Sequence, residues 1–196
     1  MDKIKLIILC GEAGVGKDAI LHRIMELEPQ LFNEIVSCTT RPPREGEIDG
    51  INYHFLTVEQ FTEKILNGDM LEATEFNNWH YGTMASSLSQ DKTNIGVFNP
   101  AGIACLLEDD RLDITVFRII ARSKTRLIRQ LTREADPDVS EIIRRFSTDN
   151  EAFQELDDLV FDGKFDNANY YEFENEYEDD LEECARLIID WAKCDN

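Results

Sequence analysis

The sequence is poor in the features that mark disulfide-stabilised, zinc-binding and membrane-spanning proteins. Its five cysteines are odd in number, show no CxxC spacing and have no histidine partner nearby. This pattern favours reduced thiols in a cytoplasmic setting over disulfides or a structural zinc site. No apolar run approaches the roughly 18 residues that a membrane-spanning helix needs. The apolar stretch at 4–10 is too short for a signal peptide and contains a lysine.

Positive charge is also scarce. The 196 residues include 20 Lys and Arg against 40 Asp and Glu, which gives a formal net charge of −20. A nucleic-acid duplex or an anionic membrane would be repelled at long range, so we expect neither as a partner. Residues 122–145, however, contain 7 basic and 4 acidic side chains. Such a basic segment could hold a small polyanion, although a helix with a solvated charged face has the same composition.

The order of the expected elements is that of an α/β fold in a single domain, 1–196. An apolar, β-branched run at 4–9 is typical of a buried parallel strand, and a glycine-rich loop and a helix at 17–27 follow it. Further strands are expected at 34–37, 93–98, 114–120 and 170–173. Further helices are expected at 100–107, 123–133, 139–159 and 179–193.

Residues 37–90 interrupt this alternation. Thr57 and Gln60 form a capping-box signature at the start of a short helix that ends at Gly68. Alternating runs at 70–76 and 79–83 flank Asn77-Asn78, which is a hairpin turn signal. We therefore expect a small mixed subdomain at 37–90, inserted into a core made of 1–36 and 91–196.

A candidate phosphate-binding loop, GEAGVGK, follows the first strand at 11–17. Glycines allow backbone N–H groups to turn inward, and the following helix N-terminus adds positive potential, so phosphate oxygens can bind there. The lysine would reach the β- and γ-phosphates. A plain strand-to-helix turn is the alternative interpretation. The residues in and directly after this loop that are expected to bind ATP are Gly11, Glu12, Ala13, Gly14, Val15, Gly16, Lys17 and Asp18.

The segment SCTTRPPREGEIDGINYHF at 37–55 resembles the GMP-binding segment of guanylate kinases. The likeness continues through GDMLE at 68–72 and HYGT at 80–83, with the family's spacing, and it includes the phosphate loop. By this resemblance the chain is identified as a member of that family. The resemblance implies a P-loop NTPase-type parallel sheet flanked by helices, with a nucleotide-monophosphate-binding insert at 37–90 and a helical lid at about 122–147.

The residue types in these segments suit a guanine nucleotide. Two arginines three positions apart can each bind a phosphate with a bidentate fork, and tyrosine hydroxyls could donate to the same phosphate. Guanine presents N1–H and a 2-amino group, which a carboxylate can accept, whereas adenine lacks this donor pair. By itself each residue has a plain structural explanation, and it is their joint spacing that favours a site. The resemblance assigns GMP binding to Ser37, Arg41, Arg44, Tyr53, Glu72, Tyr81 and Thr83.

The second half resembles the family more loosely. Arg145 matches the second of two lid arginines that neutralise the transferring phosphoryl group, and Arg133 is the best match for the first. Asn175 stands where the family places an asparagine near the nucleotide base, and a turn residue before the last helix is the alternative. The resemblance therefore implies Lys17, Arg41, Arg133 and Arg145 as catalytic residues.

The sequence departs from the family at three places. Asp18-Ala19 follow the loop lysine where the family usually has a hydroxyl, both acids are missing from the strand end GVFN at 96–99, and the lid lacks a Gly-Arg-Gly element. Asp18 could bind Mg²⁺ in place of the hydroxyl. Alternatively, it is only a favourable acid in the first turn of a helix, worth about 0.3–1 kcal/mol. Asn99-Pro100 is most simply an N-cap followed by proline at the first helical position.

The function expected from these features is ATP-dependent phosphorylation of GMP or dGMP to GDP or dGDP, with Mg²⁺ and with ATP as the phosphoryl donor. Two alternatives stay open. One is a catalytically degenerate guanylate kinase-like binding module, which the altered metal residues favour and the intact glycine-lysine loop opposes. The other is a kinase of the same family that acts on another nucleoside monophosphate or on a sugar phosphate.

Overall fold

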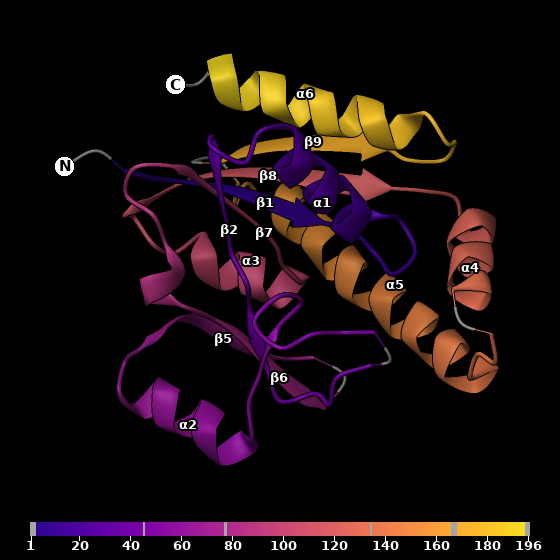
Figure 1. The fold of residues 1–196 in the computed structure, drawn as a ribbon, viewed down its shortest axis with the longest axis horizontal. Coiled ribbons are helices and arrows are strands. Elements are labelled where there is room, and N and C mark those ends of the chain that lie inside the picture. Colours follow the sequence, from indigo (N-terminus) through magenta and orange to yellow (C-terminus); the bar gives the residue numbers. More distant parts are fainter. Residues whose placement is uncertain (1–2, 45, 77, 134, 166–167, 195–196) are drawn as a thin grey trace.

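A parallel five-stranded sheet forms the centre of the computed structural model, which describes residues 3–44, 46–76, 78–133, 135–165 and 168–194. The strand order is β2-β7-β1-β8-β9, and every pairing is parallel (Figure 1). The strands are β1 (Ile4–Cys10), β2 (Phe32–Glu34), β7 (Thr93–Val97), β8 (Leu112–Ile120) and β9 (Asn169–Glu174). The expected α/β fold with a parallel sheet flanked by helices is confirmed.

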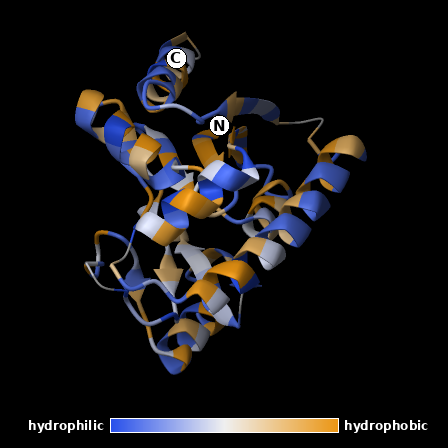
Figure 2. Ribbon diagram, turned by 90° about the vertical axis from the view of Figure 1, so that its right-hand side faces the viewer, coloured by the Kyte–Doolittle hydropathy of each residue, from blue (hydrophilic) through white to orange (hydrophobic). Residues whose placement is uncertain are grey.

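Helices cover both faces of this sheet, which explains why β1 is apolar along almost its whole length. Side chains alternate between the two faces of a strand. Ile7 and Leu9 therefore pack in the core layer shared with α1 (Lys17–Leu27) and α6 (Asp180–Cys194). Leu6 and Ile8 pack in the layer shared with α3 (Pro100–Leu106) and α5 (Val139–Phe161). Figure 2 shows the helices banded with hydrophobic and hydrophilic residues, as expected of elements that bury one face.

A second sheet lies beside the first and has the order β4-β3-β6-β5. Its strands are β3 (Cys38–Thr39), β4 (His54–Phe55), β5 (Met70–Phe76) and β6 (Trp79–Met84), and η1 (Ala85–Ser87) leads back to the first sheet. The helix α2 (Val58–Leu66) begins with the expected capping box. In the turn between β5 and β6, Asn78 is left-handed with φ 63°, whereas Asn77 lies outside the described residues.

The expected elements agree with the structure to within two residues, with three exceptions. The strand expected at 34–37 is instead Phe32–Glu34, because the chain leaves the sheet edge after Ile35, whose N–H bonds to the Ile95 carbonyl at 2.8 Å. The strands β3 and β4 were not expected, since two residues are too few to show an alternating pattern. The helix α4 (Ser123–Thr132) was located correctly.

Within the described part of the chain, every helix is too short or too polar to cross a bilayer. All five cysteines are free thiols, and Cys10, Cys38 and Cys184 are buried.

Candidate nucleotide-binding site

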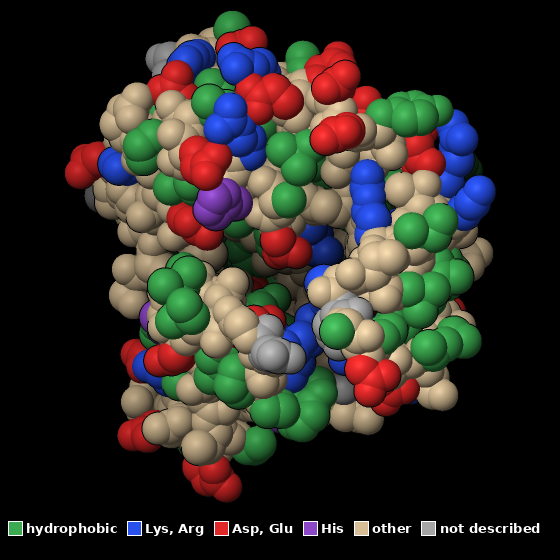
Figure 3. Space-filling view, turned by 45° about the vertical axis from the view of Figure 1, so that its right-hand side comes forward, with side chains coloured by type: hydrophobic (Ala, Val, Ile, Leu, Met, Phe, Trp, Pro, Cys, Tyr) green, Lys and Arg blue, Asp and Glu red, His purple; other side chains and the backbone are tan. Residues whose placement is uncertain are grey.

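A cleft lies between the two sheets and the helix pair α4–α5, at the carboxyl ends of β1 and β7. This is the edge at which open parallel sheets bind ligands. Figure 3 shows the cleft as a hollow with basic and acidic side chains at its border. The structure brings most of the residues expected from the sequence into its wall, namely Gly11, Ala13, Gly14, Lys17, Asp18, Ser37, Arg41, Arg44, Tyr53, Glu72, Tyr81, Arg133 and Arg145.

The other expected residues, Glu12, Val15, Gly16, Thr83 and Asn175, lie next to the cleft and not in its wall. Asn175 is buried behind the loop, where its Nδ2 donates to the Val15 carbonyl at 2.7 Å. The structure therefore shows Asn175 supporting the loop, and its contact with a nucleotide base stays a prediction.

The phosphate loop has a shape that requires glycine at Gly14 and Gly16, as it does at Gly11. Gly14 and Gly16 have φ values of 86° and 94°, in the left-handed region that side chains disfavour. A Cβ atom at Gly14 would lie 2.5 Å from the backbone oxygen of Arg126, and one at Gly16 would lie 2.5 Å from Nδ2 of Asn175. Both glycines are thus fixed by close approach as well as by backbone conformation.

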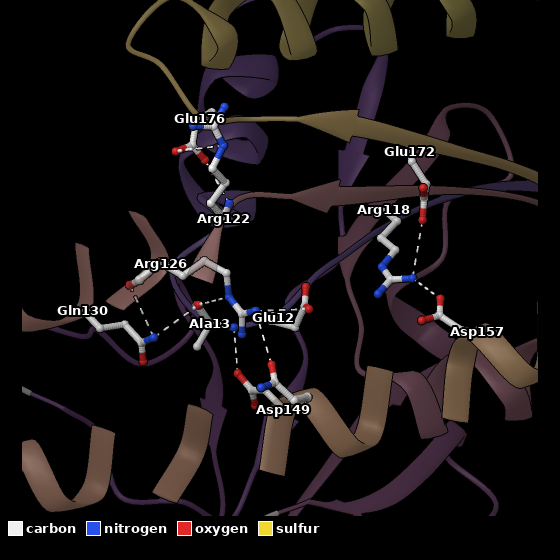
Figure 4. Close-up of polar contacts among 11 residues, drawn as sticks. Glu12, Ala13, Arg118, Arg122, Arg126, Gln130, Asp149, Asp157, Glu172 and Glu176 are labelled. Atoms are coloured by element: carbon white, nitrogen blue, oxygen red, sulfur yellow. Dashed lines mark hydrogen bonds and ion pairs between the residues drawn. The ribbon is translucent and has the colours of Figure 1, made fainter. Parts of the chain in front are cut away.

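Side chains of α4 hold the loop from one side (Figure 4). Arg126 and Gln130 both donate to the Ala13 carbonyl at 3.3 Å, and Arg126 also pairs with Glu12 at 3.2 Å. Arg126 is almost fully buried, with its guanidinium 4.5 Å from the ring centroid of Phe146. Because a buried charge needs a partner, this pairing ties α4 firmly to the loop.

A carboxylate of α5 holds the same loop from the other side. Asp149 is buried, and its Oδ2 accepts the N–H of Ala13 at 2.7 Å. Burial raises the pKa of Asp149, while the Ala13 N–H and the charges of Lys17 and Arg126 oppose this rise. The sequence analysis missed this residue. The available signal was its spacing, four residues after Arg145 on an expected helix, which places the two on one helical face.

Four of the arginines that line the cleft, Arg41, Arg44, Arg133 and Arg145, lie close enough to interact electrostatically. Arg41 is buried and forms a bidentate pair with Glu47, with both N–O distances 2.9 Å. The pKa of Arg44 is lowered by burial and by the positive charges of Arg145, Arg41 and Arg133. Arg145 in turn pairs with Glu141 at 2.6 Å. These guanidinium groups repel one another, and a bound anion would offset this repulsion because it attracts all of them.

Two tyrosines pack beside this cluster. The guanidinium of Arg41 lies 5.4 Å from the ring centroid of Tyr53, and the ring centroids of Tyr53 and Tyr81 are 6.0 Å apart in an edge-on arrangement. Both line the cleft. Their arrangement is compatible with phosphate-binding hydroxyls next to the arginines.

The far end of the cleft contains a buried carboxylate. Burial raises the pKa of Glu72 to about 7, against the opposing hydrogen bond from Thr83. The hydroxyl oxygens of Ser37 and Thr83 are 3.5 Å apart. An uncharged ligand edge with two N–H donors would supply the partners that an ionised carboxylate needs here.

Asn99 has the role expected of a helix cap. Its Oδ1 accepts the N–H of Gly102 at 2.7 Å, and its Nδ2 donates to the Thr74 hydroxyl at 3.2 Å. The N-cap interpretation is therefore confirmed, and the cap ties α3 to β5 of the second sheet.

Asp18 lies in the first turn of α1, next to Lys17, and lines the cleft. Among the described residues, His, Cys, Asp and Glu side chains form no group of three or more that could hold a metal ion. A divalent cation at Asp18 would therefore need ligand oxygens from a bound phosphate, as Mg²⁺ ordinarily uses.

By its fold and its cleft, this is an α/β protein with a cleft at the carboxyl edge of a parallel sheet. Within this class, a family model described as guanylate kinase matches residues 3–183, and the chain belongs to that family. A guanylate kinase from Frankia casuarinae is 34% identical over 142 residues, which are 72% of this chain and 70% of that relative.

Other relatives match over a shorter segment or share only the fold. A guanylate kinase from Nostoc sp. is 46% identical over 79 residues, 40% of this chain and 39% of its own length. This match thus spans about two fifths of the relative. The crystal structure of guanylate kinase from Anaplasma phagocytophilum superposes with a TM-score of 0.67 and 18% identity, covering 100% of this chain and 88% of that one. That likeness shows the same fold.

The close approach of the Arg126 backbone to Gly14 predicts that a side chain at this position destabilises the protein. Gly14→Ala and Gly68→Ala both place a side chain at positive φ, which costs roughly 1 kcal/mol. Only Gly14→Ala also meets backbone, since nothing lies within 4 Å of a Cβ at Gly68. We expect Gly14→Ala to lose a further ~1–3 kcal/mol in urea unfolding. Equal losses for the two variants would contradict the packing of α4 against the loop.

The burial of Glu72 predicts how stability depends on pH. Its pKa of about 7 lies above the ordinary 4.5, so the folded protein binds this proton more tightly than the unfolded chain does. This contribution to the free energy of unfolding therefore falls as the pH rises from about 4.5 to 7. We expect Glu72→Gln to gain stability relative to the unmodified protein over this range, on the order of 1–3 kcal/mol by pH 8.

Urea unfolding at pH 5 and pH 8 measures this difference. Glu75→Gln is the matched control, because Glu75 is exposed on the same strand. A Glu72→Gln effect of the same size at both pH values would show that Glu72 does not bind its proton more tightly in the folded state.

Proposed function

We propose that this protein transfers a phosphoryl group from ATP to GMP or dGMP, forming ADP and GDP or dGDP. The observation that carries this proposal is that a cluster of four arginines shares one cleft with the glycine-lysine loop and the buried carboxylate of Glu72. A monophosphate in this cluster would face the end of a triphosphate on the loop. Two anions can be brought this close only where positive charge separates and neutralises them.

The roles of the residues follow from this arrangement. Lys17 and the loop amides would bind the ATP phosphates, while Arg41, Arg44, Tyr53 and Tyr81 would bind the acceptor phosphate. Arg133 and Arg145 would neutralise the phosphoryl group in transit. The acceptor phosphate is already anionic at neutral pH, so alignment and charge stabilisation suffice without a strong general base.

The specificity for guanine would come from Glu72, Ser37 and Thr83. An ionised Glu72 accepts hydrogen bonds from the N1–H and 2-amino group of guanine, and Ser37 and Thr83 provide hydroxyls for the carbonyl. Adenine would leave the buried carboxylate unsatisfied, which is an effective way to reject a ligand. Because guanine bonds to the ionised form, the affinity for GMP should rise as the pH passes the pKa of Glu72.

We assign the parts of the chain accordingly. Residues 1–36 and 91–196 would form the core, 37–90 the monophosphate-binding insert and about 122–147 the lid. Closure of the lid over both nucleotides would exclude water, which otherwise would hydrolyse ATP. The free thiols suit the cytoplasm, where small-molecule nucleotides are the partners of such an enzyme.

Mg²⁺ is the cation that suits the site, since ATP phosphates and a hard carboxylate oxygen are its preferred ligands. Asp18 would contribute this carboxylate in place of a hydroxyl. When bound, the ion supplies neutralisation of phosphate charge. A binding module without catalysis remains the second candidate, favoured by the loss of that hydroxyl.

An ADP-release assay across ribo- and deoxynucleoside monophosphates tests the function. We expect turnover with GMP or dGMP and none with AMP, CMP or UMP. Lys17→Ala should lower kcat/KM by about 100-fold or more, because it removes a charge from the ATP phosphates. Lys124→Ala is the control, since Lys124 is exposed on α4 outside the cleft. Bound GMP without turnover of any acceptor would favour the binding module, and turnover of another acceptor alone would reassign the substrate.

Substitution of Asp18 tests the metal assignment. If the carboxylate binds Mg²⁺, Asp18→Asn should raise the Mg²⁺ concentration for half-maximal activity about tenfold, with little effect on ATP binding without metal. Titration of activity with Mg²⁺ at fixed ATP measures this. An unchanged midpoint would leave Asp18 only as a first-turn acid of α1.

A further inference from the structure

The peptide unit of Ala13 is held from both sides by the two helices that line the cleft. Arg126 and Gln130 of α4 donate to its carbonyl, and Asp149 of α5 accepts its N–H (Figure 4). Asp149 is only 6% exposed, so this bond is protected from water. A charge-assisted hydrogen bond in such surroundings is strong and directional.

This peptide determines which way the next amides point. Among the residues that the structure describes, the N–H groups of Gly14 and Gly16 donate to no acceptor in the protein. They are left for a phosphate, whereas the N–H of Ala13 is already used. Holding the peptide of Ala13 thus restricts a glycine-rich loop that would otherwise sample many conformations.

The helix that supplies Asp149 also reaches the arginine cluster. Arg145, Asp149 and Phe153 follow one another at four-residue spacing, so they share one face of α5. Arg145 lies close enough to lower the pKa of Arg44, and Phe153 is buried in the core against the sheet. One rigid face of α5 therefore runs from the core past the phosphate loop to the monophosphate-binding arginines.

We propose that Asp149 is a positioning residue of the ATP site, which holds the phosphate loop in its binding shape from the same helix that presents Arg145 to the acceptor. This rests on the proposed function. Asp149 acts through Ala13, whose N–H it accepts, and is not itself a catalytic residue. The seating of α5 then determines the affinity for ATP.

Equilibrium titration of the full chain with adenylyl imidodiphosphate and, separately, with GMP tests the proposal. Asp149→Ala should weaken binding of the ATP analogue about tenfold or more, the size expected for loss of a charge-assisted hydrogen bond. Binding of GMP alone should change less than about twofold, because the acceptor site is not touched. Asp149→Asn should restore most of the affinity, since an amide oxygen can still accept the Ala13 N–H.

Asp157→Asn is the matched control. Asp157 lies two turns further along α5 and pairs with Arg118 instead of the loop (Figure 4), so its loss should leave both affinities unchanged. Hydrogen exchange of the peptide covering 11–17 gives a second readout and should be faster in Asp149→Ala than in Asp157→Asn.

The outcomes separate the two proposals. Equal loss of both nucleotides in Asp149→Ala would indicate a general structural role and overturn the inference. Tighter binding of the ATP analogue in Asp149→Asn would also overturn it, because the carboxylate would then compete with phosphate. The unmodified chain could fail to bind GMP while Asp149→Ala still binds the ATP analogue more weakly than Asp149→Asn and Asp157→Asn do. That result would contradict only the proposed acceptor. Failure of the unmodified chain to bind the ATP analogue would overturn both.

Discussion

The phosphate loop depends on two close contacts, one with backbone and one with a side chain, that only glycine permits. Arg126 of α4 approaches Gly14, and the side chain of Asn175 approaches Gly16, each within 2.5 Å of where a Cβ would lie. The loop is therefore not a free turn between β1 and α1. Its shape is determined by segments more than 100 residues away in the sequence. The N–H groups of the loop take their orientation only when α4 and the segment after β9 are in place.

A protein with a net charge of −20 can still bind anions, because electrostatics is local at physiological ionic strength. Charges more than about 8–10 Å apart in water are largely screened. Inside the cleft, Arg41, Arg44 and Arg145 act at short range and in a partly desolvated space. Glu47 and Glu141 pair with two of these arginines and so limit the repulsion that the cluster would otherwise cost. The same pairs set the directions of the guanidinium groups.

Much of the fold could be predicted from sequence, because long elements carry a strong periodic signal. The helix 17–27 and the strand 70–76 were located to the residue. The failures are short elements, such as β2, where pairing with β7 and not periodicity decides the boundary. In the candidate site, Lys17, Arg41 and Glu72 were found because they fall in local motifs. Their assigned roles remain predictions.

The residues that sequence analysis missed act across the fold. Arg126 and Asp149 belong to no local motif, and their significance appears only when α4 and α5 pack on either side of Ala13. Asn175 shows the converse, since its position was noted but the contact that the structure reveals is with the loop backbone. A local motif indicates which groups can bind a ligand. The packing that orients these groups involves residues from distant parts of the chain.

The phosphate loop is approached by carboxylates from the helices around it. The end of β7 leads to Asn99, whose side chain caps α3 and bonds to Thr74. Acidic groups instead approach the loop from α1, through Asp18, and from α5, through Asp149. Because α5 carries both Asp149 and Arg145, it joins the loop to the arginine cluster in one rigid element. The geometry of the loop therefore depends on how α5 is seated against the core.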